Sequence, residues 1–406
     1  MESVVVTGMG AVSCLGHDLA SIGAALRDGQ SGIVRDPVRV ELGFRCPLTG
    51  AIRGFDPNAL LDRKERRSMG EPALYAAVAA LRALEDAGLS RDAVARPEVG
   101  VVLGNDSVAE GTRRAVDETR AEHGTRTLGS SAVIHAMTSS PSINLSVMLG
   151  TRGAAWTVAG ACAAGAHAVG QSAMLLAHAQ QDVILAGGTQ EINWAGSCAF
   201  DGLGAFSASQ GDPAEASRPF CVDRDGLVPS GGAAVLVLER ASHARARGAR
   251  IRAELLGYAF SSDGHHVTIP DGIGAARCMC CALEIAGLGP ADIDYVSAHA
   301  TGTPVGDEVE ARAIREVFGD SQPAVSSTKG MTGHECWMAG ASELVYALVM
   351  AEQGFIAKNR NLREPGPGCH GLDLVRTTRD RRPRTILSNS FGFGGTNACI
   401  VLRATP

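Results

Sequence analysis

The stretch Thr157-Val-Ala-Gly-Ala-Cys162-Ala-Ala-Gly-Ala-His-Ala-Val-Gly170 passes from a β-type run into an Ala-rich helical pattern, with a cysteine at the junction. Cys162 is therefore predicted at the start of a helix. There, unpaired N–H groups and the positive end of the helix dipole favour a thiolate over a thiol and can donate to an oxyanion. The small residues on both sides leave room for a substrate chain to approach the sulfur. The alternative is a buried cysteine that only packs.

Strand-like and helix-like runs alternate along the whole chain. β-rich runs that end in small residues recur at 4–7, 99–103, 182–186, 233–238, 295–298 and 398–402. Ala-rich helical patterns lie at 72–87 and 163–178. This alternation predicts an α/β protein whose buried sheets carry helices on their faces.

Two halves are predicted within this α/β body. The Arg- and Ala-rich stretch 239–250 indicates the joint, with an N-terminal half over 1–243 and a C-terminal half over 244–406. Each half has its own Gly-rich strand ending, at 186–189 and at 394–397. A fixed internal similarity of this kind is typical of duplication, although the matching segments are only four residues long.

Composition narrows the class of protein. The chain has 406 residues, 45% hydrophobic and 20% charged, which suits two core-forming halves packed as one body. A net charge of −6 gives no general attraction to nucleic acid or to an anionic membrane surface. The cysteine spacing shows no disulfide framework, the N-terminus opens on a strand-like run, and no apolar run approaches the roughly 20 residues of a membrane span. We therefore expect a reduced, cytoplasmic protein.

Two further motifs place histidines in loops. Ser297-Ala-His299-Ala-Thr-Gly-Thr-Pro-Val-Gly-Asp307 carries a histidine directly after a strand, and Ser326-Ser-Thr-Lys-Gly-Met-Thr-Gly-His334 does so a second time. One cysteine with two loop-borne histidines suits acyl-thioester chemistry, which needs a nucleophile and donors for a developing enolate. The chain has neither a phosphate-binding glycine loop nor a dinucleotide motif, so no cofactor is predicted.

At these motifs the sequence resembles the β-ketoacyl-acyl-carrier-protein synthases, or ketosynthases. The likeness runs from Val4 to Leu402. It is carried by six segments in family order: VVTGMG at 5–10, the turn at Cys162, DRDG at 223–226, HATGTP at 299–304, TKGMTGH at 328–334 and NSFGFGGTN at 389–397. Within the family the chain looks most similar to synthase I, through LDRK at 61–64, RCM at 277–279 and AIREVFG at 313–319.

The resemblance implies a thiolase-type fold, in which two duplicated αβ halves form a layered α-β-α-β-α body and the chain acts as a dimer. By position, Cys162 would be acylated from an acyl-carrier thioester. His299 and His334 would donate to the carbonyl of a malonyl thioester as carbon dioxide leaves. The enolate would then attack the acyl-cysteine and give a β-ketoacyl thioester extended by two carbons. The substrates would be carried on the phosphopantetheine of acyl carrier protein, with no other cofactor.

Supporting residues are carried over in the same way. The backbone N–H groups of Cys162 and Phe393 would form an oxyanion hole, and Phe391 and Phe393 would sit in a gating loop rich in glycine. Lys329 and Glu310 match the family's supporting pair, to which we assign an orienting and electrostatic role.

A basic cluster is the predicted docking site for the acidic carrier protein. Arg63, Lys64, Arg66 and Arg67 supply four cations at the head of a helix, and Arg45 is expected to join them. The alternative is a charged face that is only solvated.

The chain departs from the family pattern after His334. Trp337 and Met338 stand where the standard synthases have small residues and a leucine, so both are predicted to reshape the substrate pocket, with Thr301 and Thr303. A similar signature is associated with ketosynthases of polyene and aryl-polyene type II polyketide systems, which implies specialised, unsaturated acyl chains. The alternative is that Trp337 fills core.

Two other functions share this fold. A non-catalytic chain-length subunit that pairs with a true ketosynthase would lack the nucleophile, which Cys162 argues against. A degradative thiolase needs a second cysteine near the C-terminus, where Cys399 is the nearest candidate but lies inside an apolar strand. Homodimer and heterodimer both stay open. Cys278, Cys280 and Cys281 have no matching ligands at metal spacing, so no metal site is predicted.

Overall fold

Most strands of the chain join one mixed sheet. The computed structural model describes residues 2–405, and 11 strands pair in the order β11-β10-β9-β12-β13-β8-β1-β7-β6-β4-β5, while β2 and β3 form a separate ladder. The strands are β1 (Val4–Val12), β2 (Ile33–Arg35), β3 (Leu48–Gly50), β4 (Val99–Gly104), β5 (Ala155–Val158), β6 (Val183–Gln190), β7 (Gly232–Arg240), β8 (Ala253–Ser262), β9 (Tyr295–Ser297), β10 (Ala324–Ser326), β11 (Asp373–Leu374), β12 (Thr385–Gly392) and β13 (Thr396–Ala404). Each predicted strand run lies in one of them, apart from single terminal residues.

Helices cover both faces of this sheet. The α-helices are α1 (Leu19–Asp28), α2 (Pro37–Glu41), α3 (Arg63–Arg66), α4 (Glu71–Ala87), α5 (Arg91–Val94), α6 (Ala109–Ala121), α7 (Ala132–His135), α8 (Ser140–Leu149), α9 (Ala164–Ala177), α10 (Cys198–Leu203), α11 (Ala241–Ala246), α12 (Ile273–Ala286), α13 (Pro304–Phe318), α14 (Lys329–Thr332) and α15 (Ala339–Gln353). The 3-10 turns are η1 (Pro57–Ala59), η2 (Ala161–Ala163), η3 (Pro213–Glu215), η4 (Pro290–Asp292), η5 (Cys336–Met338) and η6 (Phe393–Gly395). The helices predicted at 72–87 and 163–178 are α4 and α9.

The two faces of each central strand bury into different cores, as the alternation of side chains along a strand requires. In β7, Ala234, Leu236 and Leu238 pack into a central core, while Ala233, Val235 and Val237 pack against α4 and α8. In β13, Ala398, Ile400 and Leu402 face the same central core, while Cys399 and Val401 pack against α12 and α13.

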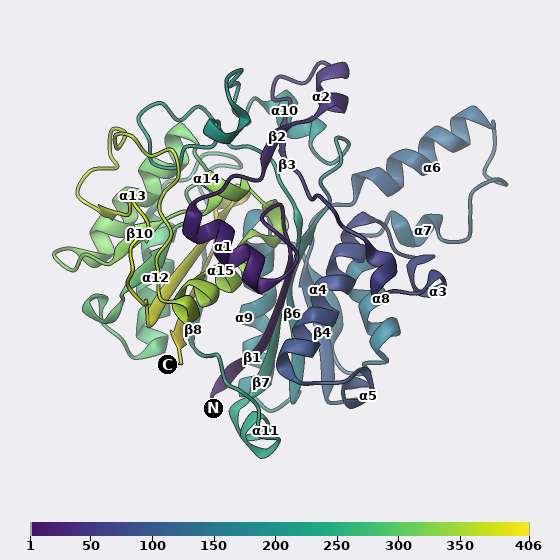
Figure 1. The fold of residues 1–406 in the computed structure, drawn as a ribbon, viewed down its shortest axis with the longest axis horizontal. Coiled ribbons are helices and arrows are strands. Elements are labelled where there is room, and N and C mark those ends of the chain that lie inside the picture. Colours follow the sequence, from purple (N-terminus) through teal and green to yellow (C-terminus); the bar gives the residue numbers. More distant parts are fainter. Residues whose placement is uncertain (1, 406) are drawn as a thin grey trace.

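Three cores therefore separate five layers. α4 and α8 form one outer layer and α12 and α13 the other, with α9 and α15 between the two parts of the sheet (Figure 1). Residues 339–351 of α15 are buried throughout, as expected for a helix enclosed between two parts of the sheet. The predicted layered α-β-α-β-α body is confirmed.

The two halves meet edge to edge within the sheet. β1 pairs with β8 over three residue pairs, Val4 with Leu255, Val5 with Glu254 and Val6 with Ala253. Strands from the first half of the chain lie on one side of this seam and strands from the second half on the other.

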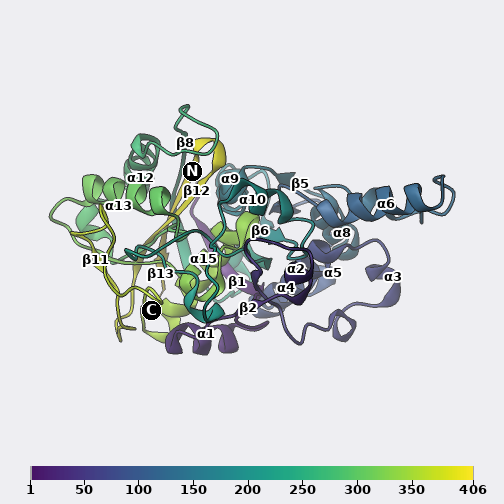
Figure 2. The same ribbon diagram turned by 90° about the horizontal axis from the view of Figure 1, so that it is seen from above.

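One element leaves the layers: α6 projects away from the body in both views (Figures 1 and 2) and buries none of its side chains. Across residues 2–405, no helix combines the length and apolar character needed to cross a membrane.

Candidate active site

Cys162 lies on a tight turn between β5 and α9, as the middle residue of η2. Ala161 before it has a φ of +47°, in the left-handed region that residues with a side chain rarely adopt. The N–H of Ala161 donates to Oδ2 of Asp106 at 3.0 Å, which holds the turn in place. The turn presents Cys162 to a cavity of about 620 Å³.

The thiol of Cys162 is 8% exposed, and this burial controls its ionisation. Burial raises the pKa of Cys162 to about 12, although Lys329 and the N–H groups of Cys162 and Phe393 act in the opposite direction. The amides act in the direction predicted for the start of the helix, but the lost hydration of the thiol outweighs them. The nucleophile rests as a thiol and has to lose its proton when it attacks.

Two backbone amides lie beside Cys162. The N–H groups of Cys162 itself and of Phe393 both lower the pKa of the thiol. Phe393 opens η6 at the tip of the β12–β13 hairpin. Gly392 makes the close approach possible, because a Cβ at this position would lie 3.1 Å from the Cys162 nitrogen. The structure thus brings together the two donors that the resemblance predicted for an oxyanion hole.

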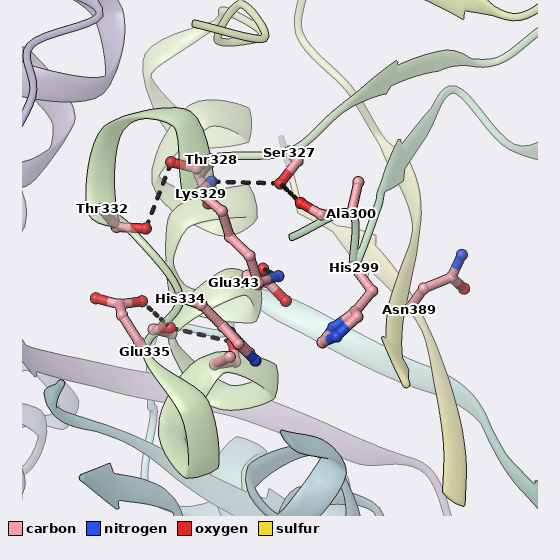
Figure 3. Close-up of polar contacts among 12 residues, drawn as sticks. His299, Ala300, Ser327, Thr328, Lys329, Thr332, His334, Glu335, Glu343 and Asn389 are labelled. Atoms are coloured by element: carbon pink, nitrogen blue, oxygen red, sulfur yellow. Dashed lines mark hydrogen bonds and ion pairs between the residues drawn. The ribbon is translucent and has the colours of Figure 1, made fainter. Parts of the chain in front are cut away.

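His299 and His334 enter the same cavity from two separate segments (Figure 3). Their ring centroids are 5.2 Å apart and their planes almost perpendicular. Burial, followed by the nearby charge of Lys329, lowers the pKa of both imidazoles well below 6.5. Both rings are therefore neutral. Both ring nitrogens of His334 and Nδ1 of His299 are without a hydrogen-bond partner among residues 2–405.

Lys329 and Glu310, the predicted supporting residues, make different contacts near the two histidines. The ammonium of Lys329 contacts the carboxylate of Glu343 on α15 (Figure 3). Glu310 instead accepts hydrogen bonds from the N–H groups of His299 at 2.8 Å and Ala300 at 2.6 Å. It therefore holds the backbone of the first histidine loop, while Lys329 with Glu343 forms the buried ion pair beside both rings.

Sequence reasoning missed Glu343 and the carboxylate network around it. Glu343 is the single acidic residue in the buried apolar run 339–351, and that isolated charge was the available signal. Glu335, directly after His334, accepts hydrogen bonds from Ser342 at 2.5 Å and from Tyr346 at 2.7 Å. Burial raises the pKa of Glu335 to about 7 and also raises that of Glu343, against the pull of Lys329.

Aromatic side chains form much of the wall near the nucleophile. Phe200 stacks on Phe393, with ring centroids 5.8 Å apart, and on Phe206 at 6.0 Å. Phe391 and the predicted Thr301 and Thr303 also line the cavity. Phe391 lies 6.0 Å from the His299 ring. The cavity thus combines a polar histidine end with an aromatic end.

Trp337 and Met338 do not line this cavity, which corrects part of the predicted pocket. Met338 is wholly buried in the central core, because η5 turns its side chain toward α15 and the sheet. Trp337 is 6% exposed and packs behind Phe200 and Cys162. Its indole N–H donates to the hydroxyl of Ser107 at 3.2 Å. Cys336, which has a φ of +44°, takes the position on the cavity wall.

The basic residues of the predicted docking site divide into two places. Arg63, Lys64, Arg66 and Arg67 lie in or next to α3, whose start is closed by a capping box between Asp62 and Glu65. Arg45 instead lies next to α10, where its N–H donates to Asp201 at 2.8 Å. α3 and α10 lie apart in both views (Figures 1 and 2). Arg45 does not join the α3 cluster within one chain, because it follows α2 to the other side of the molecule.

Known proteins share both the sequence and this architecture. The family model for the β-ketoacyl synthase N-terminal domain matches residues 1–244, and that for the C-terminal domain matches residues 252–363. 3-Oxoacyl-[acyl-carrier-protein] synthase 1 of Escherichia coli K12 is 41% identical over 409 residues, which cover 99% of each chain.

Three solved structures superpose over all of this chain and all of their own. A β-ketoacyl synthase from Burkholderia phymatum has a TM-score of 0.95 at 35% identity. The ishigamide ketosynthase/chain length factor has 0.92 at 31%. A type II polyketide ketosynthase, AntDE, in complex with its acyl-carrier protein AntF and bound to the hexaketide has 0.91 at 29%. With both domain models matched and the nucleophile, histidines and amide donors gathered in one cavity, the chain belongs to the β-ketoacyl synthase family of enzymes.

Proposed function

We propose that the protein condenses a Cys162-bound acyl chain with malonyl-acyl-carrier-protein in a decarboxylative Claisen reaction. One observation carries the proposal: a single cavity holds a cysteine, two backbone N–H groups that lower the pKa of its thiol and two neutral imidazoles. The presence of the cysteine and both imidazoles in one cavity also argues against a non-catalytic chain-length subunit, which needs no nucleophile.

The first step is transfer of the acyl group to Cys162. The sulfur attacks the carbonyl of the acyl-carrier thioester, a new carbon–sulfur bond forms and the carrier thiol leaves. The proton of Cys162 passes to the departing carrier sulfur, with a neutral imidazole of the cavity as the intermediate acceptor. The N–H groups of Cys162 and Phe393 stabilise the negative charge on the carbonyl oxygen.

The second step is decarboxylation and carbon–carbon bond formation. His299 and His334 donate to the thioester carbonyl of the malonyl group, so the electron pair released with carbon dioxide is held as an enolate. The enolate carbon attacks the acyl-cysteine carbonyl and the Cys162 sulfur leaves and regains a proton. Neutral rings suit this role, because an imidazolium would protonate the enolate before it attacks. Glu310 fixes the backbone of His299, and Lys329 with Glu343 sets the local charge.

The aromatic wall favours unsaturated acyl chains of type II polyketide or polyene assembly over saturated fatty acyl chains. Phe200 stacks on both Phe206 and Phe393 in the cavity wall, and Trp337 packs behind Phe200. Planar conjugated chains stack on such a surface, whereas saturated chains gain only apolar burial. One structural relative is named as the ketosynthase of a type II polyketide acyl-carrier protein, which supports this preference.

The carrier protein would dock through the exposed cations of α3, and a second subunit would pair at the β5 edge. β5 is the last strand at one end of the sheet, and its Trp156 is 41% exposed. An open edge with an exposed aromatic residue is a ready site for strand pairing. The partner is either a second copy or a ketosynthase-like chain-length subunit, and a chain length factor accompanies the ketosynthase in one relative's name.

The cytoplasm is the proposed location. The nucleophile works only as a free thiol or thiolate, and every cysteine of the chain is free in the structure. A reducing compartment keeps such thiols available.

Intact mass spectrometry tests the assignment directly. Wild type and Cys162→Ala are incubated with an acyl-carrier thioester and then with malonyl-carrier, and the products are identified. Cys280→Ala, which removes an exposed thiol on α12 outside the cavity, is the matched control. We expect wild type and Cys280→Ala to gain the acyl mass and to release a β-keto product two carbons longer, while Cys162→Ala gains nothing. Acylation of Cys162→Ala, or an unacylated wild type with carrier present, would remove Cys162 from this role.

A further inference from the structure

A second cavity of about 360 Å³ lies behind the nucleophile turn. His167, Tyr258 and Thr396 line it, and they come from α9, β8 and β13. α9 follows Cys162, and β13 is the second strand of the hairpin that carries Phe393. The cavity therefore lies where the two elements that supply the amide donors meet.

His167 bonds to both neighbours at this junction. The ring is 9% exposed, with Nδ1 2.8 Å from the Tyr258 hydroxyl and Nε2 3.0 Å from the Thr396 hydroxyl. Burial lowers the pKa of His167, so the ring is neutral and has one donor and one acceptor. Both partners are hydroxyls, which can donate or accept, so either tautomer satisfies both bonds.

The His167 ring also packs against the turn that carries Cys162. A Cβ at Gly160 would lie 2.9 Å from Cδ2 of His167, so the imidazole occupies the space beneath the residue that leads into Ala161 and Cys162. One side chain therefore contacts the turn that carries one amide donor and bonds to the hairpin that carries the other.

Thr396 is one of the points at which the hairpin tip is anchored. The tip also bonds to the neighbouring loop, through the Gly394 N–H to the Val267 carbonyl at 2.6 Å and the Asp263 N–H to the Gly395 carbonyl at 2.9 Å. Thr396 pairs across the hairpin with Gly392, and the tip between them is Phe393, Gly394 and Gly395. The two tip glycines have φ values of +78° and +69°, and a Cβ at Gly394 would meet nothing within 4 Å. The position of the Phe393 N–H thus depends in part on how firmly Thr396 is held.

We propose that His167 is a positioning residue, which through its hydrogen bond to Thr396 holds the Phe393 N–H against the Cys162 turn. The two amides belong to elements far apart in sequence, and the His167–Thr396 bond is a direct polar tie between them. This inference rests on the proposed ketosynthase function, in which both amides stabilise the carbonyl oxygen.

Thr396→Val tests the tie, because valine keeps the shape of threonine and removes the hydroxyl. Thr396→Ser keeps the hydroxyl and is the rescue variant. Ser172→Ala is the matched control. Ser172 lies on α9, the helix that carries His167, and its buried hydroxyl donates to the Ala168 carbonyl of the same helix at 2.7 Å. His167→Phe, which keeps a ring beneath Gly160 and loses both nitrogens, is the second variant.

Three quantities are measured for each variant: the rate of Cys162 acylation by an acyl-carrier thioester, the rate of Cys162 alkylation by iodoacetamide, and Tm. Alkylation forms no oxyanion and depends on the Phe393 N–H only through the thiol pKa, so a positioning role slows acylation more than alkylation. We expect Thr396→Val and His167→Phe to slow acylation by about 10- to 100-fold, with the KM for acyl-carrier unchanged, while Thr396→Ser and Ser172→Ala stay close to wild type. The double variant should be no slower than either single one, because both remove the same bond.

Wild-type acylation rates in Thr396→Val would overturn the proposal, as would equal losses in acylation and alkylation, which indicate general disruption. If Thr396→Val does not fold, His167→Phe decides by the same criteria. The wild-type arm separates this inference from the function itself. A wild type that is not acylated contradicts the proposed function, whereas an acylated wild type with an equally fast Thr396→Val contradicts only the role of His167.

Discussion

Cys162, His299 and His334 are all buried, and burial moves the pKa of the thiol up and the pKa of the two imidazoles down. Both shifts favour the uncharged form, as expected for groups removed from water. The site at rest is thus close to neutral at these three residues. Charge develops only during reaction, on the substrate oxygen, where the amides and imidazoles can stabilise it.

The buried carboxylate of Glu335 makes a prediction about stability. Its pKa rises from 4.5 to about 7 on folding, so the folded state holds this proton more tightly than the unfolded state. The stability from that proton is complete below the unfolded pKa and is lost as the pH rises through the folded pKa. Glu335→Gln stays neutral. Its amide oxygen replaces one carboxylate oxygen as acceptor, and its NH2 group takes the place of the other, where the hydroxyl of Ser342 or Tyr346 accepts instead. We therefore expect the unfolding free energy of Glu335→Gln, relative to wild type, to rise by roughly 2 kcal/mol between about pH 5 and pH 7.

Urea unfolding of both proteins across this pH range gives the difference directly. Glu284→Gln, at an exposed position near the end of α12, is the control, because its side chain is in water before and after unfolding. A pH-independent difference for Glu335→Gln would contradict the raised pKa.

Helix α3 shows how one short element can present charge without depending on packing. Its capping box satisfies two N–H groups at the start of the helix and leaves the cations on the surface. Arg91 pairs with Glu65 and neutralises the single acidic residue of the run, so the remaining side chains form a basic surface. Such a surface attracts an acidic partner over a distance set by the salt concentration.

Charge reversal on α3 tests carrier docking. For Lys64→Glu/Arg67→Glu we expect acylation by acyl-carrier to lose about 3- to 10-fold in kcat/KM, mainly through KM and most strongly at low salt. Acylation by a carrier-free acyl-pantetheine thioester should be unchanged, because it does not use the surface. Arg376→Glu, an exposed arginine outside α3, is the matched control. Equal losses with both substrates would place the effect in the site and not in docking.

At the scale of the whole molecule, the layers bring together segments that lie far apart in sequence. The nucleophile comes from the first half of the chain, and both histidines and Phe393 come from the second. The β1–β8 seam and the shared central core hold the two halves as one body. The cavity between them therefore depends on the packing of α9 against α15 and the sheet.

The open edge of the sheet makes a prediction about assembly. Trp156→Lys places a charge on the exposed edge strand β5, and we expect it to weaken the dimer by at least about 30-fold in Kd. Analytical ultracentrifugation measures this, for the chain alone and with a candidate chain-length subunit. Val222→Lys, at an equally exposed apolar residue on a loop, should leave the mass unchanged. An unchanged dimer in Trp156→Lys would place the interface elsewhere.

The α/β layering followed from the sequence alone, as did the choice of Cys162, His299 and His334 as candidate site residues, because these depend on short contiguous patterns. Alternating apolar runs predict strands whatever the runs pack against. Cys162, His299 and His334 each lie in a local motif whose backbone is set by neighbouring small residues. The resemblance to the ketosynthases rested on the same motifs, so the family followed without knowledge of any distant contact.

Only the tertiary structure decided which of these residues meet. Lys329 pairs with Glu343, which sequence reasoning missed, Met338 turns into the core, and Arg45 lies away from α3. The rise in the Cys162 pKa, against the predicted effect of the helix start, has the same origin. Each of these outcomes depends on burial and on distances between elements, which the linear order of residues does not contain.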